Sequence, residues 1–590
     1  MILELLPVAT VLLLPGFTLV VATNNHRGRG LADILGLSFG LSLVLLPILL
    51  MLNYAMVRTV NSAFLYLIIF ESVSILLFRI KSLREIKIGR EDVIIMLLIL
   101  SLTAGIISIF YYLSPIFPFA YSADFEHHLA MSKDFLRGST ELSSVSYPPA
   151  VHFLIGSGIS LMGLESIISM RQTMILLGVL APLLIYSTAS NVLHNRKVAV
   201  LASLLYIPVG MWWHVLFINS LYANFYANLV SLSVLLLLVE YVELGSKLRM
   251  GLLFLGGLAL YLSHFTILIF LVALWVMVPV AFFLARPMSR PLLKGIITLT
   301  IPSVVIAILR PNLVSLILSI PGSSGGDKFV GIPTTTLTSF LGSFSYFLQF
   351  LYFNLQSESL FFLALVLIFT TPLLVLRQRL GIWAFFFCVW FFVVWATAPM
   401  TKLAWRSSYY ALLPLVFVFA ISLRSIDIEA GQIKKTYYKA KANSSHLFRR
   451  LIQFALLGII FTSSLLPPLL SDAFENPEDS RSQDEGIYDA VKWVRSNTLP
   501  NQSVLVVVGD WRLTYVGLLT GRPVSYYSFL SPNKTVDLAM ERDSRFIIVS
   551  RVVVQNGSAL SLYEIYKKAD GFTVVWENSS VVIFAIPRRT

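Results

Sequence analysis

The sequence predicts a polytopic α-helical membrane protein with a soluble α/β domain at its C-terminal end. Of its 590 residues, 57% are hydrophobic and only 13% are charged, and apolar runs of membrane-spanning length recur as far as about residue 470. Soluble domains carry about 25% charged residues, so this composition excludes a large soluble enzyme and a disordered chain. Cys388 is the only cysteine, which excludes an intrachain disulfide and a cysteine-based metal site.

The apolar runs define a membrane domain, residues 1–470. A spanning helix needs about 20 apolar residues, and the sequence offers about 14 candidates, of which 250–263 and 409–423 are short. In chain order they are 3–22, 31–52, 60–78, 93–113, 172–192, 198–217, 225–243, 250–263, 265–284, 294–318, 358–376, 382–399, 409–423 and 450–468. We therefore expect about 14 transmembrane helices.

Lysine and arginine positions predict the orientation of these helices. Alternate loops hold 23 of the basic residues, whereas the opposite loops hold seven. Because cytoplasmic loops are enriched in Lys and Arg, both chain termini are placed outside. The short apolar segment 148–164 would reverse every later basic loop if it spanned, so we interpret it as a re-entrant or interfacial helix on the outer face. The net charge of +13 then reflects the membrane topology, with the basic residues lying beside anionic membrane lipids. It does not indicate a nucleic-acid-binding surface.

Residues 471–590 form the predicted soluble domain. Helical spacing at 484–497 and 560–570 alternates with strand-like runs at 503–508, 545–554, 572–576 and 581–586, which is typical of a small α/β domain. Four N-x-S/T sequons lie here, at Asn501, Asn533, Asn556 and Asn578. Sequons mark exposed sites on the glycosylated side of a membrane. They agree with a tail outside the plasma membrane, although a Ser- and Thr-rich tail could also produce them by chance.

The first large outer loop, residues 114–171, contains the strongest candidates for chemistry. Its first part holds Asp124, Glu126, His127 and His128, a density of ionisable groups unmatched in the other outer loops. Asp124 and His128 are spaced i, i+4 and would share one face of a helix. Such a pair can act as a general base or bind a divalent metal such as Mg²⁺ or Mn²⁺. A solvated helix with an ordinary ion pair is the alternative.

The second outer loop offers polar contacts rather than a catalyst. Its candidates for contacts with an acceptor, a sugar or a lipid headgroup are Asn219, Tyr222, Asn224 and Tyr226. Asn and Tyr suit hydrogen bonding and stacking on such groups. Interfacial anchoring of the tyrosines is the alternative interpretation.

Three later residues could bind a phosphate. Lys402 and Arg406 lie near the outer end of the span 409–423, flanked by aromatic residues, and Arg makes bidentate contacts with phosphate. His264, at an outer turn, is either a further phosphate candidate or a satisfied polar residue. The glycine-rich late outer loop 319–357 could cover a bound ligand. Interfacial anchoring explains Lys402 and Arg406 equally well.

Together these features resemble the GT-C superfamily of membrane glycosyltransferases, which includes oligosaccharyltransferase catalytic subunits and protein O-mannosyltransferases. The phrases that carry the resemblance are YSADFEHH, SYPPAVHFL, HNRK, WRSSYYALLPL and GDWRLTYVGLLTGRPVSYY. It covers roughly residues 93–590, with three extra spans in front. The Trp-Trp-Asp-Tyr-Gly motif of oligosaccharyltransferases is absent, so the resemblance does not extend to sequon-directed N-glycosylation.

The resemblance implies inverting transfer of a sugar from a polyprenyl (dolichyl) phosphate or diphosphate to an acceptor hydroxyl on a glycolipid, a glycan or a protein. Asp124 would be the base or would orient the acceptor. His128, Glu126 and His127 would support it, and Asp124 and His128 would hold any metal. Arg406 and Lys402, with His264 as a weaker candidate, would bind the leaving phosphate. The alternatives are a non-catalytic membrane scaffold and a lipid or solute transporter, for which inverted repeats are expected and none is visible.

Overall fold

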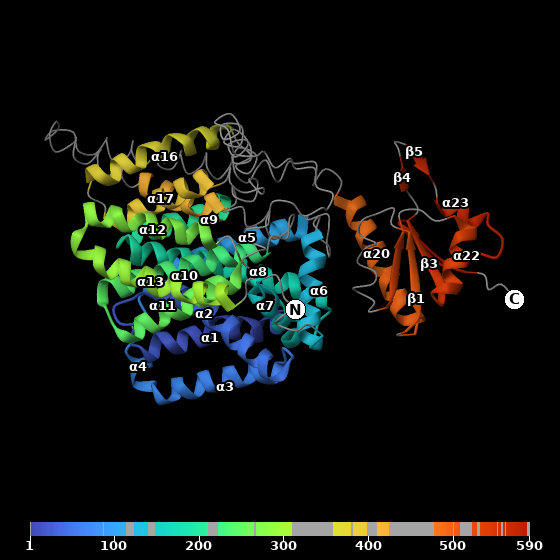
Figure 1. Cartoon of the computed structure of the whole chain (residues 1–590), viewed down its shortest axis with the longest axis horizontal. Coiled ribbons are helices and arrows are strands. Elements are labelled where there is room, and N and C mark those ends of the chain that lie inside the picture. Colours follow the sequence, from blue (N-terminus) through green and yellow to red (C-terminus); the bar gives the residue numbers. More distant parts are fainter. Residues whose placement is uncertain are drawn as a thin grey trace.

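The computed structural model shows a bundle of roughly aligned helices with a mixed α/β domain beyond one end (Figure 1). The structure describes residues 2–86, 88–113, 123–139, 148–209, 222–264, 267–309, 358–378, 381–397, 410–423, 477–499, 501–507, 522–527, 531–550, 553–555, 558–560 and 562–586. The predicted span 450–468 and the late outer loop 319–357 lie outside these residues.

Helices make up the whole described part of the membrane domain. The first group is α1 (Ile2–Ala22), α2 (Leu31–Val57), α3 (Ser62–Phe78), α4 (Ile80–Arg84), α5 (Arg90–Leu113), α6 (Ala123–Arg137), α7 (Ala150–Met162) and α8 (Ser166–Val192). The second group is α9 (Arg196–Val209), α10 (Tyr222–Leu244), α11 (Lys247–Ser263), α12 (Ile267–Leu284), α13 (Arg286–Leu309), α16 (Glu358–Gln378) and α17 (Ile382–Thr397). A further apolar helix follows at Tyr410–Leu423.

Five of the described helices, α1, α2, α5, α8 and α10, are long and apolar enough to cross a membrane. Six shorter apolar helices accompany them. The structure therefore confirms a mostly helical integral membrane protein. The predicted number of about 14 spans remains a prediction.

The bundle is centred on α2, which packs against α1, α8, α10 and α11. Two glycines allow this close packing. A Cβ on Gly36 would lie 2.1 Å from the Leu183 carbonyl oxygen of α8, and one on Gly16 would lie 1.8 Å from the Ser38 carbonyl oxygen. Small residues at such positions let helix backbones approach closely, which is how helices associate where water supplies no hydrophobic drive.

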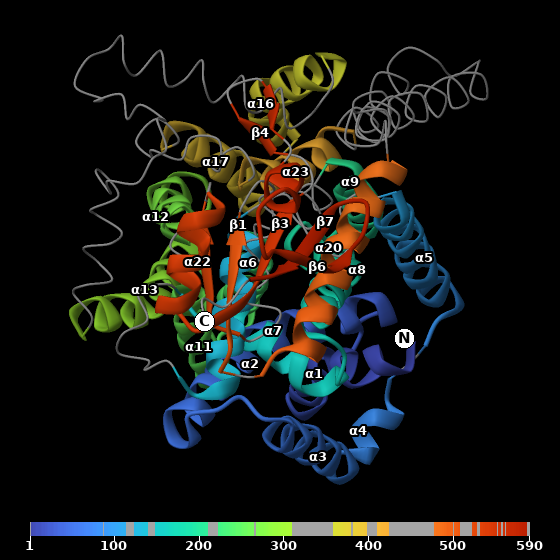
Figure 2. The same cartoon turned by 90° about the vertical axis from the view of Figure 1, so that its right-hand side faces the viewer.

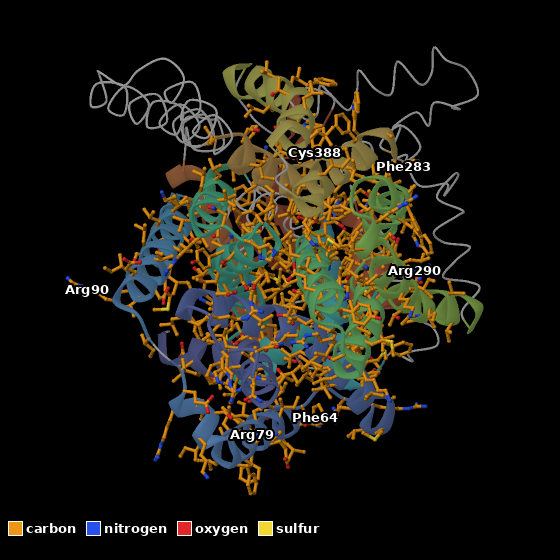
Figure 3. All side chains as sticks on the ribbon, turned by 90° about the vertical axis from the view of Figure 1, so that its left-hand side faces the viewer. Phe64, Arg79, Arg90, Phe283, Arg290 and Cys388 are labelled. Atoms are coloured by element: carbon orange, nitrogen blue, oxygen red, sulfur yellow. The ribbon has the colours of Figure 1, made fainter. Side chains whose placement is uncertain are left out.

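The predicted inner loops meet at one end of the bundle. Ion pairs join them: Arg27 with Glu85 (3.0 Å), Arg29 with Glu240 (2.6 Å), and Arg196 with Asp92. Figure 3 views the molecule from this end and shows Arg79, Arg90 and Arg290 around its rim. The basic segments that the charge pattern assigns to one side of the membrane thus share one end of the molecule. The N-terminus, α6 and the C-terminal domain lie at the opposite end (Figure 1).

Two helices of the first outer loop have the predicted character. The helix α6 contains both Asp124 and His128, so their i, i+4 spacing is helical. The helix α7 has 13 residues and is therefore about 20 Å long, which is short of the roughly 30 Å hydrocarbon core. It is largely buried against α6 and α8, as expected of a re-entrant segment.

The described residues from Pro477 onward combine helices with a five-stranded sheet. They contain α20 (Pro477–Asn497), β1 (Ser503–Val507), β2 (Val524–Tyr527), α22 (Pro532–Glu541), β3 (Ser544–Ser550), β4 (Val553–Gln555), β5 (Ser558–Leu560), α23 (Leu562–Lys567), β6 (Thr573–Glu577) and β7 (Val581–Ala585). The main sheet has the order β2-β1-β3-β7-β6. Strands β1, β2 and β3 are parallel, whereas β7 runs antiparallel to β3 and β6.

One strand prediction in this domain is wrong. The apolar run 545–554 does not form one strand, because β3 ends at Ser550 and Val553 begins a separate hairpin with β5. The strand β2 and the helix α22 are also additional to the predicted elements. Figure 1 shows α20 on the side of the sheet nearer the bundle, and Figure 2 shows the C-terminal domain in front of the bundle. The apolar face of α20, including Ile487 and Val494, belongs to the same continuous core as the membrane helices.

Candidate functional site

Two histidines join α6 to α7 at the tail end of the bundle. His128 Nδ1 lies 2.9 Å from His152 Nε2, and both side chains are buried. The two helices pack at an ordinary distance here, because a Cβ on Gly156 would lie 3.5 Å from the Ser132 carbonyl oxygen of α6. One imidazole must donate and the other accept, so the pair needs at least one neutral ring.

The first turn of α10 completes this cluster. The ring of Tyr222 stacks on His128, with centroids 5.4 Å apart, and Tyr222 is fully buried. His127, one residue earlier on α6, is exposed, and its ring centroid lies 6.2 Å from that of His152. Residues from the first and second outer loops, far apart in the sequence, therefore meet here.

A second contact brings in two further elements. His264 follows the last residue of α11 in extended conformation, and its Nδ1 lies 3.4 Å from the Tyr410 hydroxyl. Both residues are buried. His264 also acts electrostatically on His152. The ends of α6, α7, α10, α11 and the helix Tyr410–Leu423 thus converge on one region.

Burial controls the charge of this region. Desolvation, with additional repulsion from His128 and His127, holds the pKa of His152 well below its usual 6.5. His152 is therefore neutral at pH 7. An uncharged imidazole can accept or donate a hydrogen bond and can bind a metal.

Asp124 and Glu126 lie in the first turn of α6, one turn before the histidine pair. At 100° per residue, Asp124 is about 40° from His128 around the helix and Glu126 about 160° from it. Asp124 therefore lies on the side of α6 that carries the buried histidine. Their side chains lie outside the described part of the structure. Within the described residues no group of three acidic, His or Cys side chains could hold a metal, so the metal prediction remains open.

The opposite side of α6 approaches the C-terminal domain. Burial, with repulsion from Arg137 and from Arg495 of α20, lowers the pKa of Lys133 from 10.5 to about 8. Asp134 and Glu165 oppose this shift. This coupling places the last turns of α20 near α6. The C-terminal domain therefore lies beside the candidate site.

Comparison with known proteins identifies the fold. No protein-family model matches the chain, and no curated protein matches it. Two solved structures of ArnT from Cupriavidus metallidurans align with it, one bound to undecaprenyl phosphate and one in the apo state. Each has a TM-score of 0.50 and 13% identity; the alignments cover 83% and 82% of this chain and 97% of each ArnT chain.

The fold is similar to that of ArnT, a GT-C glycosyltransferase. At this identity the likeness concerns the fold alone. It supports the GT-C fold that the sequence resemblance implies. The narrower resemblance to oligosaccharyltransferases and O-mannosyltransferases remains a prediction.

The structure places the second-loop residues Asn224 and Tyr226 in different surroundings. Asn224 is buried, and its Oδ1 has no hydrogen-bond partner among the described residues, so it retains an acceptor for a ligand or a water molecule. Tyr226 is also buried, and its hydroxyl donates to the Leu43 carbonyl oxygen at 2.6 Å. That hydroxyl already makes a hydrogen bond that joins α10 to α2, which argues against a contact between Tyr226 and a sugar. Asn219, Lys402 and Arg406 lie outside the described residues.

Arg171 is one of the seven basic residues in the loops that the charge pattern places outside, and no further role was predicted for it. The structure places it in the second turn of α8, among the largest fully buried side chains. Such burial is unusual for Arg unless a partner or a ligand compensates its charge. The sequence feature that could have indicated this burial is the position of Arg171 directly before the apolar run 172–192.

Proposed function

We propose that this chain is a membrane glycosyltransferase that transfers a sugar from a polyprenyl phosphate or diphosphate to an acceptor hydroxyl. The observation that carries the proposal is the GT-C fold shared with ArnT, one structure of which is bound to undecaprenyl phosphate. The gathering of ionisable groups at the tail end of the bundle supports it independently. Acceptors consistent with this location are glycolipids, cell-surface glycans and proteins.

The proposed reaction assigns Asp124 to the acceptor. Its carboxylate takes the hydroxyl proton as the acceptor oxygen attacks the anomeric carbon. The bond from that carbon to the phosphate oxygen breaks, the electron pair leaves with the lipid phosphate, and the configuration inverts. Arg406, with Lys402, stabilises the charge that grows on the phosphate.

The contacts around α6 support this role through positioning. The pairing of His128 with His152 and the stacking of Tyr222 on His128 fix the helix that carries Asp124. A catalytic group held rigidly lowers the entropy cost of reaching the reactive geometry. Asp124 and His128 are also the residues that would hold a Mg²⁺ or Mn²⁺ ion. There it would polarise the acceptor hydroxyl or the phosphate.

The test is a transfer assay with purified protein in lipid nanodiscs. A panel of radiolabelled polyprenyl-phosphate and polyprenyl-diphosphate sugars is incubated with native membrane acceptors, with and without EDTA. Wild type is expected to label one acceptor class. Asp124→Asn is expected to reduce transfer by at least about a hundredfold, because general-base catalysis contributes 10²–10⁴-fold.

The matched control is Asp134→Asn, a carboxylate on the same helix that accepts from the Ser139 hydroxyl at 3.2 Å. It lies ten residues beyond Asp124 and is expected to retain transfer. Equal activity of Asp124→Asn and wild type would exclude Asp124 as the base. If no donor on the panel were consumed, the enzyme proposal would fail and the scaffold and transporter alternatives would take its place.

A further inference from the structure

The three described sequons of the C-terminal domain differ in their surroundings. Asn501 lies in the turn before β1, and Asn533 lies in the first turn of α22. Both are exposed. Among the described residues, no hydrogen bond engages either side chain. A bulky glycan attached to either amide would project into solvent without displacing protein atoms.

The side chain of Asn578, in contrast, makes hydrogen bonds within the C-terminal domain. Its Nδ2 donates to the Gly486 carbonyl oxygen of α20 at 2.8 Å. Its Oδ1 accepts from the backbone amides of Ser580 and Val581, each at 2.9 Å. These bonds close the turn between β6 and β7 and attach it to α20. Both the oxygen and the nitrogen of this amide are therefore engaged in hydrogen bonds.

The amide of Asn578 is also closely packed against α20. A Cβ added at Gly486 would lie only 2.8 Å from Asn578 Nδ2 and 3.0 Å from the Ser580 hydroxyl oxygen. N-glycosylation joins this amide nitrogen to the anomeric carbon of an oligosaccharide. The nitrogen loses a proton, and the lipid diphosphate of the donor leaves with the electron pair. A sugar ring at that nitrogen would separate α20 from the turn.

We propose that the C-terminal domain is N-glycosylated at Asn501 and Asn533, whereas Asn578 stays unmodified and serves as a clamp between α20 and the β6–β7 turn. The donor is a lipid-diphosphate-linked oligosaccharide, used by a separate oligosaccharyltransferase of the host. Thr535, the hydroxyl residue of the Asn533 sequon, is buried and bonds to Tyr566 Oη at 2.7 Å. Transfer to Asn533 therefore precedes the docking of α22 on the sheet.

The test is glycopeptide mass spectrometry of the full-length chain purified from membranes of its native host. Glycans are expected on Asn501 and Asn533, and unmodified peptides are expected for Asn578. A fifth sequon, Asn443, lies in the long basic loop predicted to face the cytoplasm, and it is also expected to be bare. A glycan on Asn578 or Asn443, or a bare Asn501 or Asn533, overturns the proposal.

Variants separate the two roles. Asn501→Gln and Asn533→Gln are each expected to lower the mass of the protein by one glycan and to leave the sheet intact. Asn578→Asp keeps both acceptor bonds but loses the donor to Gly486. It is expected to leave the glycan mass unchanged and to increase proteolytic cleavage between α20 and β1. Unchanged proteolysis of Asn578→Asp would contradict the clamp. Neither result depends on the transferase activity proposed for the membrane domain.

Discussion

The buried ion network at the basic end of the bundle gives a quantitative prediction. Glu240 of α10, with a side chain only 4% exposed, accepts from Arg29 Nη2 at 2.6 Å and from Asn25 Nδ2 at 3.1 Å. Arg249 Nε lies 3.9 Å from the same carboxylate. Two segments that the charge pattern assigns to the cytoplasmic side, the loop between α1 and α2 and the start of α11, are joined to α10 through this one side chain. Replacing Glu240 by Ala would leave two arginines without their shared carboxylate.

The expected loss of folding stability depends on the contacts that the two arginines keep after the substitution. Removing one partner of a buried pair costs about 3–5 kcal/mol. Arg29 keeps Asp33 at 3.3 Å, and both arginines are partly exposed, so the lower end applies. Glu240→Ala should destabilise the fold by about 3 kcal/mol, roughly a hundredfold in the unfolding equilibrium. The matched control is Glu243→Ala, one turn later, whose partner His194 is 65% exposed and whose loss should cost under about 1 kcal/mol.

Cys388 supplies the assay. It is the only cysteine in the chain and is buried in α17, so a thiol-reactive dye labels it only when the bundle opens. When reclosing is faster than labelling, the labelling rate follows the open population. Glu240→Ala should label about a hundredfold faster than wild type and Glu243→Ala at nearly the wild-type rate. Equal rates for the two variants would refute the assignment of the network as a major stabilising contact.

Three further predictions use the same labelling assay. Gly36→Ala should destabilise the folded bundle strongly, because the added Cβ would lie 2.1 Å from a backbone oxygen of α8. The control Gly105→Ala, whose Cβ would have nothing within 4 Å, should be neutral or gain up to about 1 kcal/mol of stability from helix propensity. Similar effects of the two variants would contradict the close approach of α2 and α8. Tyr226→Phe should cost about 1 kcal/mol for the lost bond to Leu43 without altering sugar transfer; lost transfer at wild-type stability would restore Tyr226 as a sugar contact. Because the pKa of His152 is lowered in the folded state, its neutral form contributes stability that is complete above pH 6.5 and declines below it. Wild type should therefore label faster at pH 5 than at pH 7.5, and His152→Gln should show a smaller difference; an equal difference would assign the acid sensitivity to other groups.

Several features were predictable because the signal is local. The i, i+4 spacing of Asp124 and His128 places both on one face if the segment is helical, and α6 contains both. The charge count predicted that segment 148–164 does not span, and α7 has 13 residues, fewer than the roughly 20 of a typical span. The buried strand β1 was visible as an unbroken apolar run.

Other elements were missed for physical reasons. The strand β2 is a partly exposed edge strand, so it lacks the apolar run that marks a buried one. The helix α22 had an available signal, since Ser531 precedes Pro532 at its first position, followed by apolar Val536 and Ala539. The run 545–554 contains Ser550 and Arg551 between its two apolar stretches, and this polar pair was the available sign that β3 ends at Ser550.

The surroundings of the candidate residues depended on partners distant in the sequence. The hydroxyl of Tyr226 bonds to a carbonyl of α2 that lies 183 positions away. The contact between His264 and Tyr410 joins residues 146 positions apart. Sequence spacing could indicate that these residues are polar and lie near the outer face. Only the folded structure shows which of these residues pack against other helices.

The binding of a polyprenyl phosphate tests the central claim most directly, because it requires no choice of sugar. Native mass spectrometry of the protein with undecaprenyl phosphate or dolichyl phosphate is compared with the matching polyprenyl alcohols, which lack the phosphate. A lipid-phosphate-dependent glycosyltransferase should retain one phosphorylated lipid per chain, and Arg406→Gln should weaken that retention. Equal retention of the alcohols and the phosphates would contradict the account.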